Sequence, residues 1–396
     1  MAKLNDNFRQ MESYNTFNTV SEKINDYKKI YPSVELLDLG VGDVTRPIIK
    51  SVIKSMENAV EELSKEETFK GYGAPHGYSF LKEAIIKHEY KMFSQDEIYI
   101  SSGTKTDITN ILELFARDSK ICVFNPMYPI YNEVCKLNGL NIHVEDASEE
   151  HNFVPQIPHK KYDIIYLCSP CNPTGVALSK EQLTNFVNYA KEYNAIILYD
   201  NVYENFITSN NVPKSIYEIE DAKYVAIEFR SFSKRISFSG VRCSYYVIPN
   251  TLQLDKLKGN INELWKKRVI LKFNGADYIA QKGAASSYTQ DAKKEISENI
   301  SYYLTNAKML KEALEELNFI VYGGVDSPYL WVKTKNNLSS WQYFYFLLEE
   351  LNIIVIPGVI FGSGGENYIR ISALGNKKTI SKSIKKLRAY YAKKED

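Results

Sequence analysis

Phe229-Arg-Ser-Phe-Ser-Lys-Arg-Ile-Ser-Phe-Ser-Gly-Val-Arg242 is the stretch that points most directly to the fold of this chain. An apolar run, residues 224–229, leads into it and predicts a buried strand of a parallel sheet. Lys234 comes just past the end of that strand, and Arg242 follows eight positions later. Open α/β sheets bind ligands at such strand ends. The stretch therefore predicts a ligand site, although a solvated loop with two surface cations would look the same in isolation.

The polar side chains of this stretch favour one kind of ligand. The hydroxyls of Ser231 and Ser233 and the guanidinium of Arg242 are suited to binding a phosphate. An amine held beside them, that of Lys234, is suited to forming a Schiff base with an aldehyde. A ligand that carries both groups would use the whole stretch.

The order of strands and helices indicates an α/β fold with a mostly parallel sheet flanked by helices. Short apolar runs predict strands at 35–39, 97–100, 121–124, 163–168 and 195–199. Helical spacing predicts helices at 48–64, 78–92, about 101–117 and 179–193. Ser179 is the predicted N-cap of the last of these, because Gln182 stands at capping-box spacing.

The pattern changes after about residue 250, which predicts a second, smaller α+β unit. Long helices are expected at 254–270 and 291–317, and shorter ones at 339–350 and 377–392. Short strands are expected at 319–322, 329–333, 353–356 and 368–371. A chain of 396 residues is too long for one simple core. We expect an N-terminal arm joined to the small domain (1–47), a large ligand-binding domain (48–290) and a small C-terminal domain (291–396), with the 291–317 helix as the bridge.

Composition excludes several classes of protein. Lys and Arg number 49 against 48 Asp and Glu, so no basic excess favours nucleic acid as a partner. No apolar run reaches the roughly 18 residues that a membrane span requires, and the N-terminus has no apolar signal segment. Five cysteines, an odd number, favour reduced thiols in a cytoplasmic protein. Cys168 and Cys171 form a Cys-x-x-Cys motif, but without a second pair for zinc neither metal nor redox use is favoured.

Pyridoxal phosphate is a ligand whose requirements recur at the predicted strand ends. It needs a carboxylate against its ring nitrogen, and Asp200 ends an apolar strand where an unpaired carboxylate would be costly. Tyr203 and Asn172 can donate to its phenolic oxygen. Each has an ordinary alternative, since an Asp can cap a turn and Asn-Pro-x-Gly is a common turn.

Three further positions complete the predicted site. Gly103-Thr104-Lys105 opens a helix, where free backbone N–H groups attract phosphate. Tyr128 lies at a strand end and can stack on the ring, unless it is simply a packed aromatic. Arg370, in a strand of the small domain, can grip a carboxylate in two parallel bonds, unless an acidic residue of the chain pairs with it.

Taken in order, these positions resemble the class I/II aminotransferases, the fold type I family of pyridoxal-phosphate enzymes, over almost the entire chain. The resemblance implies a ping-pong transfer of an amino group between an amino acid and a 2-oxo acid, with Lys234, Asp200 and Tyr203 as catalytic residues. It implies a cofactor site made of Gly103, Thr104, Lys105, Tyr128, Asn172, Asp200, Tyr203, Ser231, Ser233, Lys234 and Arg242.

Within that family, several stretches are similar to the LL-diaminopimelate aminotransferases. They are 39–47, 65–73, 227–234, 272–275 and 322–324. This resemblance implies a homodimer with shared sites, in which Tyr72 and Asn274 reach the partner's cofactor. It also implies that the substrate lies beside Gly42, Lys105, Tyr128, Asn172 and Arg370.

Departures from the subfamily pattern concern the far end of the substrate. Pro75, followed by His76, stands where the subfamily has an acidic residue for a distal ammonium. Its substrate-facing tyrosine aligns with Asn15, next to Tyr14, and residues 235–237 replace small residues. We therefore hypothesise a changed amino donor. The alternatives are LL-diaminopimelate aminotransferase proper, used in lysine biosynthesis, and a lyase, decarboxylase or oxidase on the same fold. A non-catalytic regulator is not favoured, because no segment is left over for a nucleic-acid-binding module.

Overall fold

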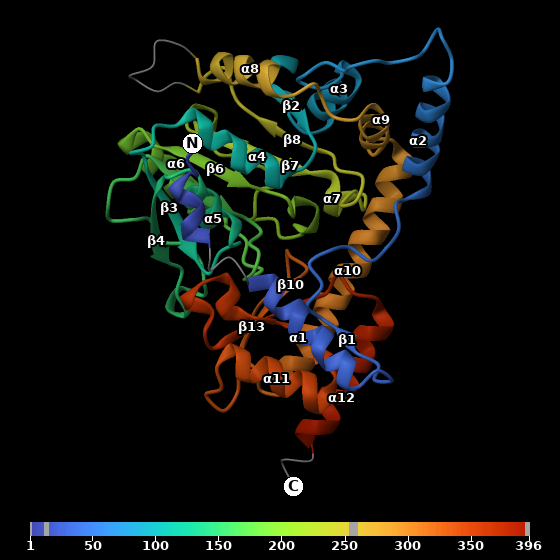
Figure 1. The fold of residues 1–396 in the computed structure, drawn as a ribbon, viewed down its shortest axis with the longest axis vertical. Coiled ribbons are helices and arrows are strands. Elements are labelled where there is room, and N and C mark those ends of the chain that lie inside the picture. Colours follow the sequence, from blue (N-terminus) through green and yellow to red (C-terminus); the bar gives the residue numbers. More distant parts are fainter. Residues whose placement is uncertain (1, 12–15, 253–259, 393–396) are drawn as a thin grey trace.

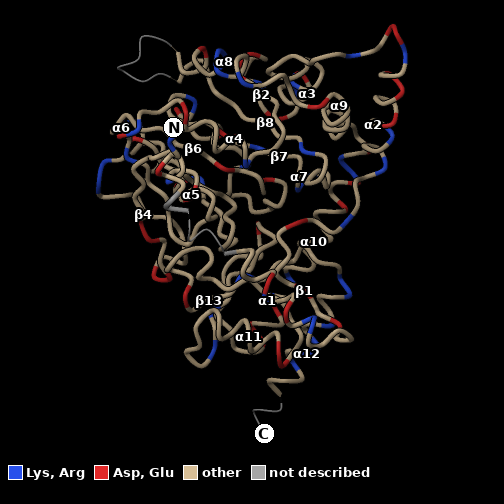
Figure 2. Tube along the Cα trace, in the orientation of Figure 1, with Lys and Arg blue, Asp and Glu red and all other residues tan. Residues whose placement is uncertain are grey.

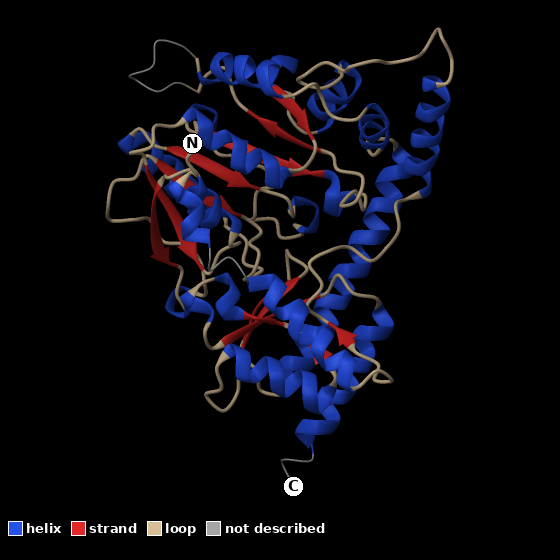
Figure 3. Cartoon of the chain, viewed as in Figure 1, coloured by secondary structure: helices blue, strands red, loops and turns tan. Residues whose placement is uncertain are grey.

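Two sheets, one above the other in Figures 1 and 3, organise the chain. The computed structural model describes residues 2–11, 16–252 and 260–392. The upper part holds a seven-stranded sheet, and the lower part holds a four-stranded sheet with the C-terminal helix beneath it. This arrangement confirms the predicted α/β fold with a second, smaller α+β unit.

The seven-stranded sheet is mostly parallel, as predicted, but one strand, β8, runs in the opposite direction to the other six. Its order is β2 (Ile98–Ser101), β8 (Ser244–Val247), β7 (Ala226–Ser231), β6 (Ile196–Asp200), β5 (Ile164–Cys168), β3 (Lys120–Asn125) and β4 (Asn141–Asp146). β8 runs antiparallel to both β7 and β2. The connection from β7 to β8 contains one short helix and makes no helical crossover of the kind that parallel neighbours need. β4 and β8 were not predicted from the sequence.

Helices cover the faces and edges of this sheet. They are α2 (Lys50–Leu63), α3 (Ser79–His88), α4 (Thr104–Asn110), α5 (Ile130–Leu137), α6 (Lys180–Tyr193), α7 (Phe232–Arg235), α8 (Ile261–Lys272) and α9 (Tyr278–Ser286). The α6 capping box is present, with Ser179 and Gln182 each bonding the other's backbone N–H. α4 is shorter than predicted, because its second half tightens into a 3₁₀ turn. The predicted helix 254–270 begins at Ile261 in the described part, and residues 254–259 lie outside it.

The four-stranded sheet is antiparallel. Its order is β12 (Ile356–Pro357), β13 (Tyr368–Ser372), β10 (Tyr329–Lys333) and β9 (Val321–Gly323). β1 (Leu37–Asp38), shorter than the predicted strand 35–39, pairs in parallel with β11 (Ile353–Ile354). The helices of this part are α1 (Thr16–Ile30), α11 (Ser340–Leu351) and α12 (Lys377–Ala392).

Short 3₁₀ helices fill the connections. They are η1 (Asp6–Met11), η2 (Gln95–Glu97), η3 (Ile111–Leu114), η4 (Glu149–His151), η5 (Glu204–Phe206), η6 (Ile216–Glu218), η7 (Ala222–Tyr224), η8 (Gly358–Phe361) and η9 (Ser363–Gly365). Most of them lie in the loops at the ends of strands, where ligand-binding residues are commonly found.

One helix, α10 (Gln290–Glu316), runs through both parts of the molecule (Figure 1). Its first half contributes Ile296, Ile300 and Tyr303 to the core around the large sheet. Its second half contributes Ala307 and Leu310 to the core around the small sheet. The N-terminal residues Val20, Leu37 and Leu39 belong to that second core as well. The two ends of the chain therefore pack together.

Charged residues of both signs are interspersed over the whole chain (Figure 2), as its net charge of +1 suggests. None of the helices in the described ranges is long and apolar enough to cross a lipid bilayer. The same ranges contain no group of His, Cys, Asp and Glu side chains arranged to hold a metal ion.

Candidate active site

A cavity of about 460 Å³ lies where the parallel strands of the large sheet end, facing the small sheet. The neighbouring strands β5, β6 and β7 end there at Cys168, Asp200 and Ser231. Most of the predicted site residues line this pocket: Gly42, Thr104, Lys105, Tyr128, Asn172, Asp200, Tyr203, Ser231, Ser233, Lys234, Arg242 and Arg370. The fold thus brings together positions that are far apart in the sequence.

Asp200 lines the pocket with a carboxyl group of which only one oxygen is hydrogen-bonded within the described residues. Its Oδ2 accepts a hydrogen bond from the Tyr131 hydroxyl at 2.6 Å, whereas its buried Oδ1 has no hydrogen-bond partner in the described part of the chain. Burial raises the pKa of Asp200 to about 6, although the bond from Tyr131 lowers it. A buried carboxylate oxygen without a partner is costly, so this position is suited to a bound cation or N–H donor.

Lys234 lies on α7, directly after β7, and its amine reaches across the pocket. Its Nζ donates to the carbonyl of Gly42 and to Oδ1 of Asp43, each at 2.9 Å. The pKa of Asp43 is lowered: burial raises it, but Lys234 and a hydrogen bond from Ser239 outweigh that effect. The lysine therefore faces the cavity, as predicted, and is held by a residue to which the sequence assigned no role.

The start of α4 and the side chain of Arg242 form an anion-binding corner. Gly103 has a φ of +134°, and a Cβ at this position would lie 1.8 Å from Nη2 of Arg242, so only glycine lets the guanidinium approach the helix start. The Gly103 N–H donates to Ser244 Oγ at 2.9 Å, which fixes the turn. The next N–H groups, of Thr104 and Lys105, are in the first turn and lack helical partners.

Arg370 reaches the pocket from β13 of the small sheet. Its guanidinium donates to Asn172 Oδ1 at 2.8 Å and to the Gly40 carbonyl at 2.9 Å, and its buried Nε has no partner in the described chain. Its Cζ lies 4.6 Å from the ring centroid of Tyr329 and 5.0 Å from that of Phe361. No ion pair to Arg370 occurs within the described residues, although its exposure is only 2%. This guanidinium is therefore suited to binding a carboxylate from a ligand.

Two tyrosines also lie in the pocket: Tyr203, predicted as a hydroxyl donor, and Tyr128, predicted to stack on the ring. Tyr203 shares a hydrogen bond of 2.8 Å with the hydroxyl of Tyr329. Tyr128 packs edge-on against Tyr131, with ring centroids 5.8 Å apart. The aromatic rings therefore surround the carboxyl of Asp200 and the guanidinium of Arg370.

Comparison with known proteins decides the family. The model of the family "Aminotransferase class I and II" matches residues 34–387. The chain belongs to the class I and II aminotransferases. It is 42% identical to the LL-diaminopimelate aminotransferase of Bacteroides thetaiotaomicron, with 98% of this chain and 99% of that one covered. It is 43% identical to the enzyme of the same name from Methanosphaera stadtmanae, with 94% and 95% covered.

Solved structures agree with this assignment. The L,L-diaminopimelate aminotransferase of Chlamydomonas reinhardtii superposes with a TM-score of 0.93 at 33% identity, covering 98% of this chain and 99% of that one. Aspartate aminotransferase of Thermus thermophilus has the same fold, with a TM-score of 0.85 at 19% identity, over 98% and 100% of the two chains. The protein is a pyridoxal-phosphate-dependent aminotransferase of fold type I.

The residues of this aminotransferase fit its cofactor on geometric grounds. The unpartnered Oδ1 of Asp200 matches a protonated pyridine nitrogen, and the corner of Gly103 and Arg242 matches a phosphate. Asn172 accepts from Arg370 with its Oδ1, which leaves the amide nitrogen to donate. The amine of Lys234 lies in the same cavity, where an aldehyde group of the cofactor could reach it.

Two predicted cofactor residues lie away from the pocket of their own chain. Tyr72 is 92% exposed on the loop after α2, and Asn274 lies on the loop after α8. The two loops touch, because a Cβ at Gly275 would lie 2.7 Å from the carbonyl oxygen of Ala74. Neither residue lines the cavity. Their predicted contact with a partner's cofactor stays a prediction.

The departures hypothesised to read the far end of the substrate are not in the pocket either. His76 Nε2 is 3.4 Å from the Lys266 carbonyl, and its ring packs edge-on against Tyr99. Arg235 is half-buried, pairs with Glu89 and does not line the cavity that Lys234 lines. Asn15 and Tyr14 lie outside the described residues. The view that Arg235 alters the substrate end of this pocket is therefore wrong.

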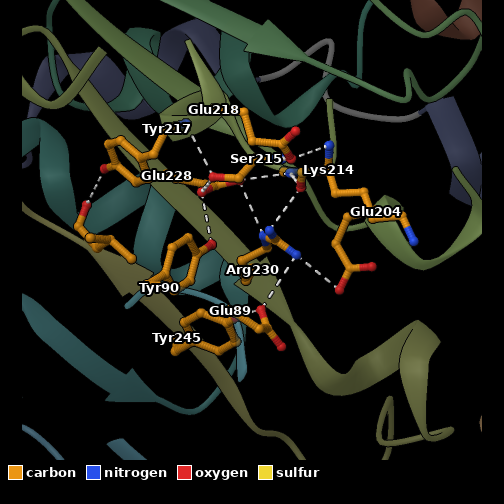
Figure 4. A network of polar contacts seen from close by, with 12 residues as sticks. Glu89, Tyr90, Glu204, Lys214, Ser215, Tyr217, Glu218, Glu228, Arg230 and Tyr245 are labelled. Carbon is orange, nitrogen blue, oxygen red and sulfur yellow. Dashed lines mark hydrogen bonds and ion pairs between the residues drawn. The ribbon is translucent and has the colours of Figure 1, made fainter. Parts of the chain in front are cut away.

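Arg235 pairs instead with Glu89, a member of the cluster of charges around Arg230 that Figure 4 shows. At its centre, Arg230 pairs with Glu204 at 3.0 Å, with Glu228 at 3.1 Å and with Glu89 at 3.6 Å. Glu89 also pairs with Arg235, whose guanidinium lies 4.3 Å from the Tyr288 ring centroid. Since both arginines are anchored here, the segment between them is fixed from behind while Lys234 faces the pocket.

Several lining residues were missed by the sequence reasoning. Asp43 stands inside a stretch that the reasoning used only for its resemblance, and Tyr131 follows Tyr128 by one helical turn. Other residues of the lining were assigned no role in the site, although Gly40, Cys168 and Ser239 stand in stretches that the sequence analysis singled out. They are Phe17, Gly40, Ile108, Cys168, Val202, Ser239, Tyr329 and Ile356.

Proposed function

We propose that this aminotransferase binds its amino acid between Arg370 and Lys234, with the α-carboxylate on the guanidinium. The observation that carries this proposal is the buried guanidinium without an acidic partner in the described chain. Gly42 connects the two residues: its carbonyl accepts from Lys234 at 2.9 Å, and a Cβ there would lie 3.7 Å from Nη2 of Arg370. A glycine at this position leaves room for the substrate's Cα between them.

The remaining pocket residues would hold the cofactor. Asp200 would pair with the ring nitrogen, Tyr203 and Asn172 would donate to the phenolic oxygen, and Tyr128 would stack on the ring. Gly103, Thr104, Ser231, Ser233 and Arg242 would hold the phosphate, with Lys105 at the boundary between cofactor and substrate. When bound, pyridoxal phosphate supplies an aldehyde for covalent attachment and a ring that draws electrons from Cα.

Lys234 would move the proton. Once its Nζ is free, the amine can take a proton from the substrate Cα and return it on the other side of the reaction. Asp43 and the Gly42 carbonyl lie within hydrogen-bonding distance of Nζ, so they keep the amine in the pocket. The amino acid and the 2-oxo acid would then bind in turn at the same arginine, which gives ping-pong kinetics.

The proposal also concerns which amino acid donates the amino group. The relatives' names favour LL-diaminopimelate, whereas Pro75 offers no carboxylate to a distal ammonium. We propose a related donor with altered recognition of its far end. The test is a panel of LL-diaminopimelate, glutamate, lysine, ornithine and aromatic amino acids, scored by conversion of the cofactor from its aldehyde to its amine form. Fastest conversion by LL-diaminopimelate would contradict the altered donor, and release of ammonia in place of a retained amino group would indicate a lyase or oxidase.

We also propose that the aminotransferase is a homodimer with shared sites. Apolar side chains are exposed beside the touching loops of Tyr72 and Asn274: Phe69 is 63% exposed and Leu271 is 83% exposed. A second copy that covers this surface would bring Tyr72 toward the partner's phosphate. Leu271→Asp should shift the mass measured by light scattering from dimer to monomer and weaken cofactor binding, whereas the same change at exposed Val325, in the C-terminal part, should do neither.

The division into units 1–47, 48–290 and 291–396 is proposed on the two cores. Val20 and Leu37 pack with the C-terminal core, whereas Ile49 and Val52 pack with the large sheet. Limited proteolysis that cuts first near residues 47 and 290 would support these boundaries.

A cytoplasmic location is proposed because all five cysteines are free thiols in the described chain. Cell fractionation with an activity assay would test it.

A further inference from the structure

One cysteine of the Cys-x-x-Cys motif, Cys168, lies at the wall of the active-site pocket, and the other, Cys171, precedes the lining residue Asn172. Cys168 is the last residue of β5, pairs in register with Asp200 and lines the pocket. Cys171 follows after two residues and precedes Asn172. Both are partly exposed, whereas the other three cysteines, Cys122, Cys135 and Cys243, are buried.

The Cys168 thiol donates to the Pro170 carbonyl, 3.5 Å away, and it also interacts with the thiol of Cys171, which distinguishes this pair from the other cysteines. The interaction with Cys168 lowers the pKa of the Cys171 thiol, although burial opposes it, and Thr174 adds to the lowering. The same interaction raises the pKa of Cys168. Burial raises the pKa of Cys135 to about 12 and raises those of Cys122 and Cys243 as well. Cys171 is therefore the thiol that most readily becomes a nucleophilic thiolate.

We propose that Cys168 and Cys171 are an oxidative modification site, at which a peroxide converts the two neighbouring thiols beside the pocket into a reversible disulfide. The thiolate of Cys171 attacks one peroxide oxygen, the O–O bond breaks, and water or an alcohol leaves with a proton. The sulfenic acid that forms is attacked by the sulfur of Cys168. The S–O bond breaks, and water leaves with the proton of Cys168. Two electrons pass from the sulfurs to the peroxide.

Disulfide formation would displace groups that the proposed function uses. An S–S bond is about 2.05 Å long, much shorter than a hydrogen bond between thiols, so residues 168–171 must move. Asn172 is attached directly to Cys171, and its Oδ1 holds Arg370 at 2.8 Å. The loop cannot relax on its far side, because a Cβ at Gly175 would lie 2.2 Å from the carbonyl oxygen of Tyr329. The movement therefore reaches the substrate-binding arginine.

The test oxidises the intact enzyme, with and without pyridoxal phosphate, using graded hydrogen peroxide. We expect the mass of the chain to fall by two hydrogen atoms and peptide mapping to find the 168–171 cross-link. Activity should fall by about a hundredfold, the effect that a displacement of about 1 Å has on a reacting group. A thiol reductant should restore both mass and activity. Bound cofactor should slow the reaction, because Cys168 shares the pocket with it.

Cys171→Ser is the matched control. This variant should keep its activity, show no loss of two hydrogens and resist peroxide. If it fails to fold, Cys171→Ala serves the same purpose. A wild-type chain that forms no 168–171 disulfide under peroxide would overturn the modification site, and a disulfide that leaves activity unchanged would overturn its effect on the site. The effect on activity rests on the proposed roles of Asn172 and Arg370, but the mass measurement does not, so the two failures are distinguishable.

Discussion

Tyr131 fixes one oxygen of the Asp200 carboxyl at 2.6 Å and leaves the other without a partner in the described chain. Both residues are buried, and both line the cavity at the strand ends. The pair thus prepares a site for one cation at one atom. A protonated ring nitrogen has the required charge and a single N–H donor, which explains why this carboxyl stands at the centre of the large sheet.

Asp200→Asn should have opposite effects on two properties: it should stabilise the cofactor-free fold and weaken cofactor binding. The folded pKa of about 6 lies above the usual value of 3.8, so ionising this carboxyl destabilises the cofactor-free fold as the pH rises from about 4 to about 6. The variant should be more stable than the cofactor-free wild type at pH 8, by up to about 3 kcal/mol, and equal to it near pH 4. Urea unfolding at the two pH values measures the difference.

The same variant should bind pyridoxal phosphate weakly, since the amide cannot neutralise the ring nitrogen. Tyr131→Phe keeps the carboxyl and is the control for lost packing. If Asp200→Asn were no more stable than the wild type at pH 8, the carboxyl would be solvated and its pairing with a cation would lose its basis.

Lys234→Ala tests the covalent attachment of the cofactor. After borohydride reduction, wild-type chain should carry the mass of one pyridoxal phosphate, and the variant should carry none. Its turnover should fall by at least about 10²- to 10⁴-fold, the usual contribution of a positioned acid–base group. Lys105→Ala is the matched control, because Lys105 lines the same pocket. Attachment that survived in Lys234→Ala and vanished in Lys105→Ala would reverse the assignment.

Arg370→Lys should weaken binding of the substrate and leave binding of the cofactor unchanged. The lysine keeps the charge but loses the planar pair of donors, and a lost charged hydrogen bond costs about 1.5–3 kcal/mol. We expect kcat/KM for an amino acid to fall about tenfold to hundredfold. An amine without a carboxylate should react equally with both enzymes. An equal loss for that amine would mean that the arginine acts on the fold and not on the substrate.

Arg235→Met should lower the free energy of unfolding, because it breaks the ion pair between Arg235 and Glu89. The change leaves Glu89 short of one partner in a buried cluster, where breaking a pair costs about 3–5 kcal/mol. The pKa of Glu89 is about 2, because Arg235 and Arg230 outweigh the burial that raises it. Denaturant unfolding and kcat should both show the loss, since Lys234 is the neighbouring residue.

A surface pair gives the control for that variant. Lys191 and Asp221 form an ion pair whose side chains are 44% and 36% exposed, so Lys191→Met should cost at most about 1 kcal/mol. If the two substitutions cost the same, the cluster in Figure 4 would contribute no more than an exposed ion pair.

Much of this site could be predicted because its residues sit at the ends of recognisable strands. Asp200 follows a run of apolar residues, and Lys234 follows another, so the parallel sheet alone brings them to one edge. Helix α6 was recognisable from its cap, since Ser179 and Gln182 have a short-range pairing that the sequence displays. Interactions between residues so close in sequence form in the same way whatever the rest of the chain does.

Other parts could not be predicted, because their partners come from far along the chain. β4 is an edge strand whose residues are mostly exposed or half-buried, so it lacks an apolar run. Tyr329 bonds Tyr203 across 126 positions, and Asp43 meets Lys234 across 191. Arg235 adjoins Lys234 in sequence but pairs with Glu89 of the charge cluster. Adjacent residues on a short helix diverge, and only the fold shows which one faces the ligand.

Helix α10 packs with both parts of the molecule that line the candidate active site. Lys234 belongs to the structure around its first half and Arg370 to the structure around its second, with Asn306 holding the carbonyls of Ala373 and Gly375 near the midpoint. A movement of the small sheet toward the large one would therefore shift or bend this helix. The separation of the two parts of the proposed site, the amine of Lys234 and the guanidinium of Arg370, therefore depends on this helix as well as on the segment 40–43, which contacts both residues.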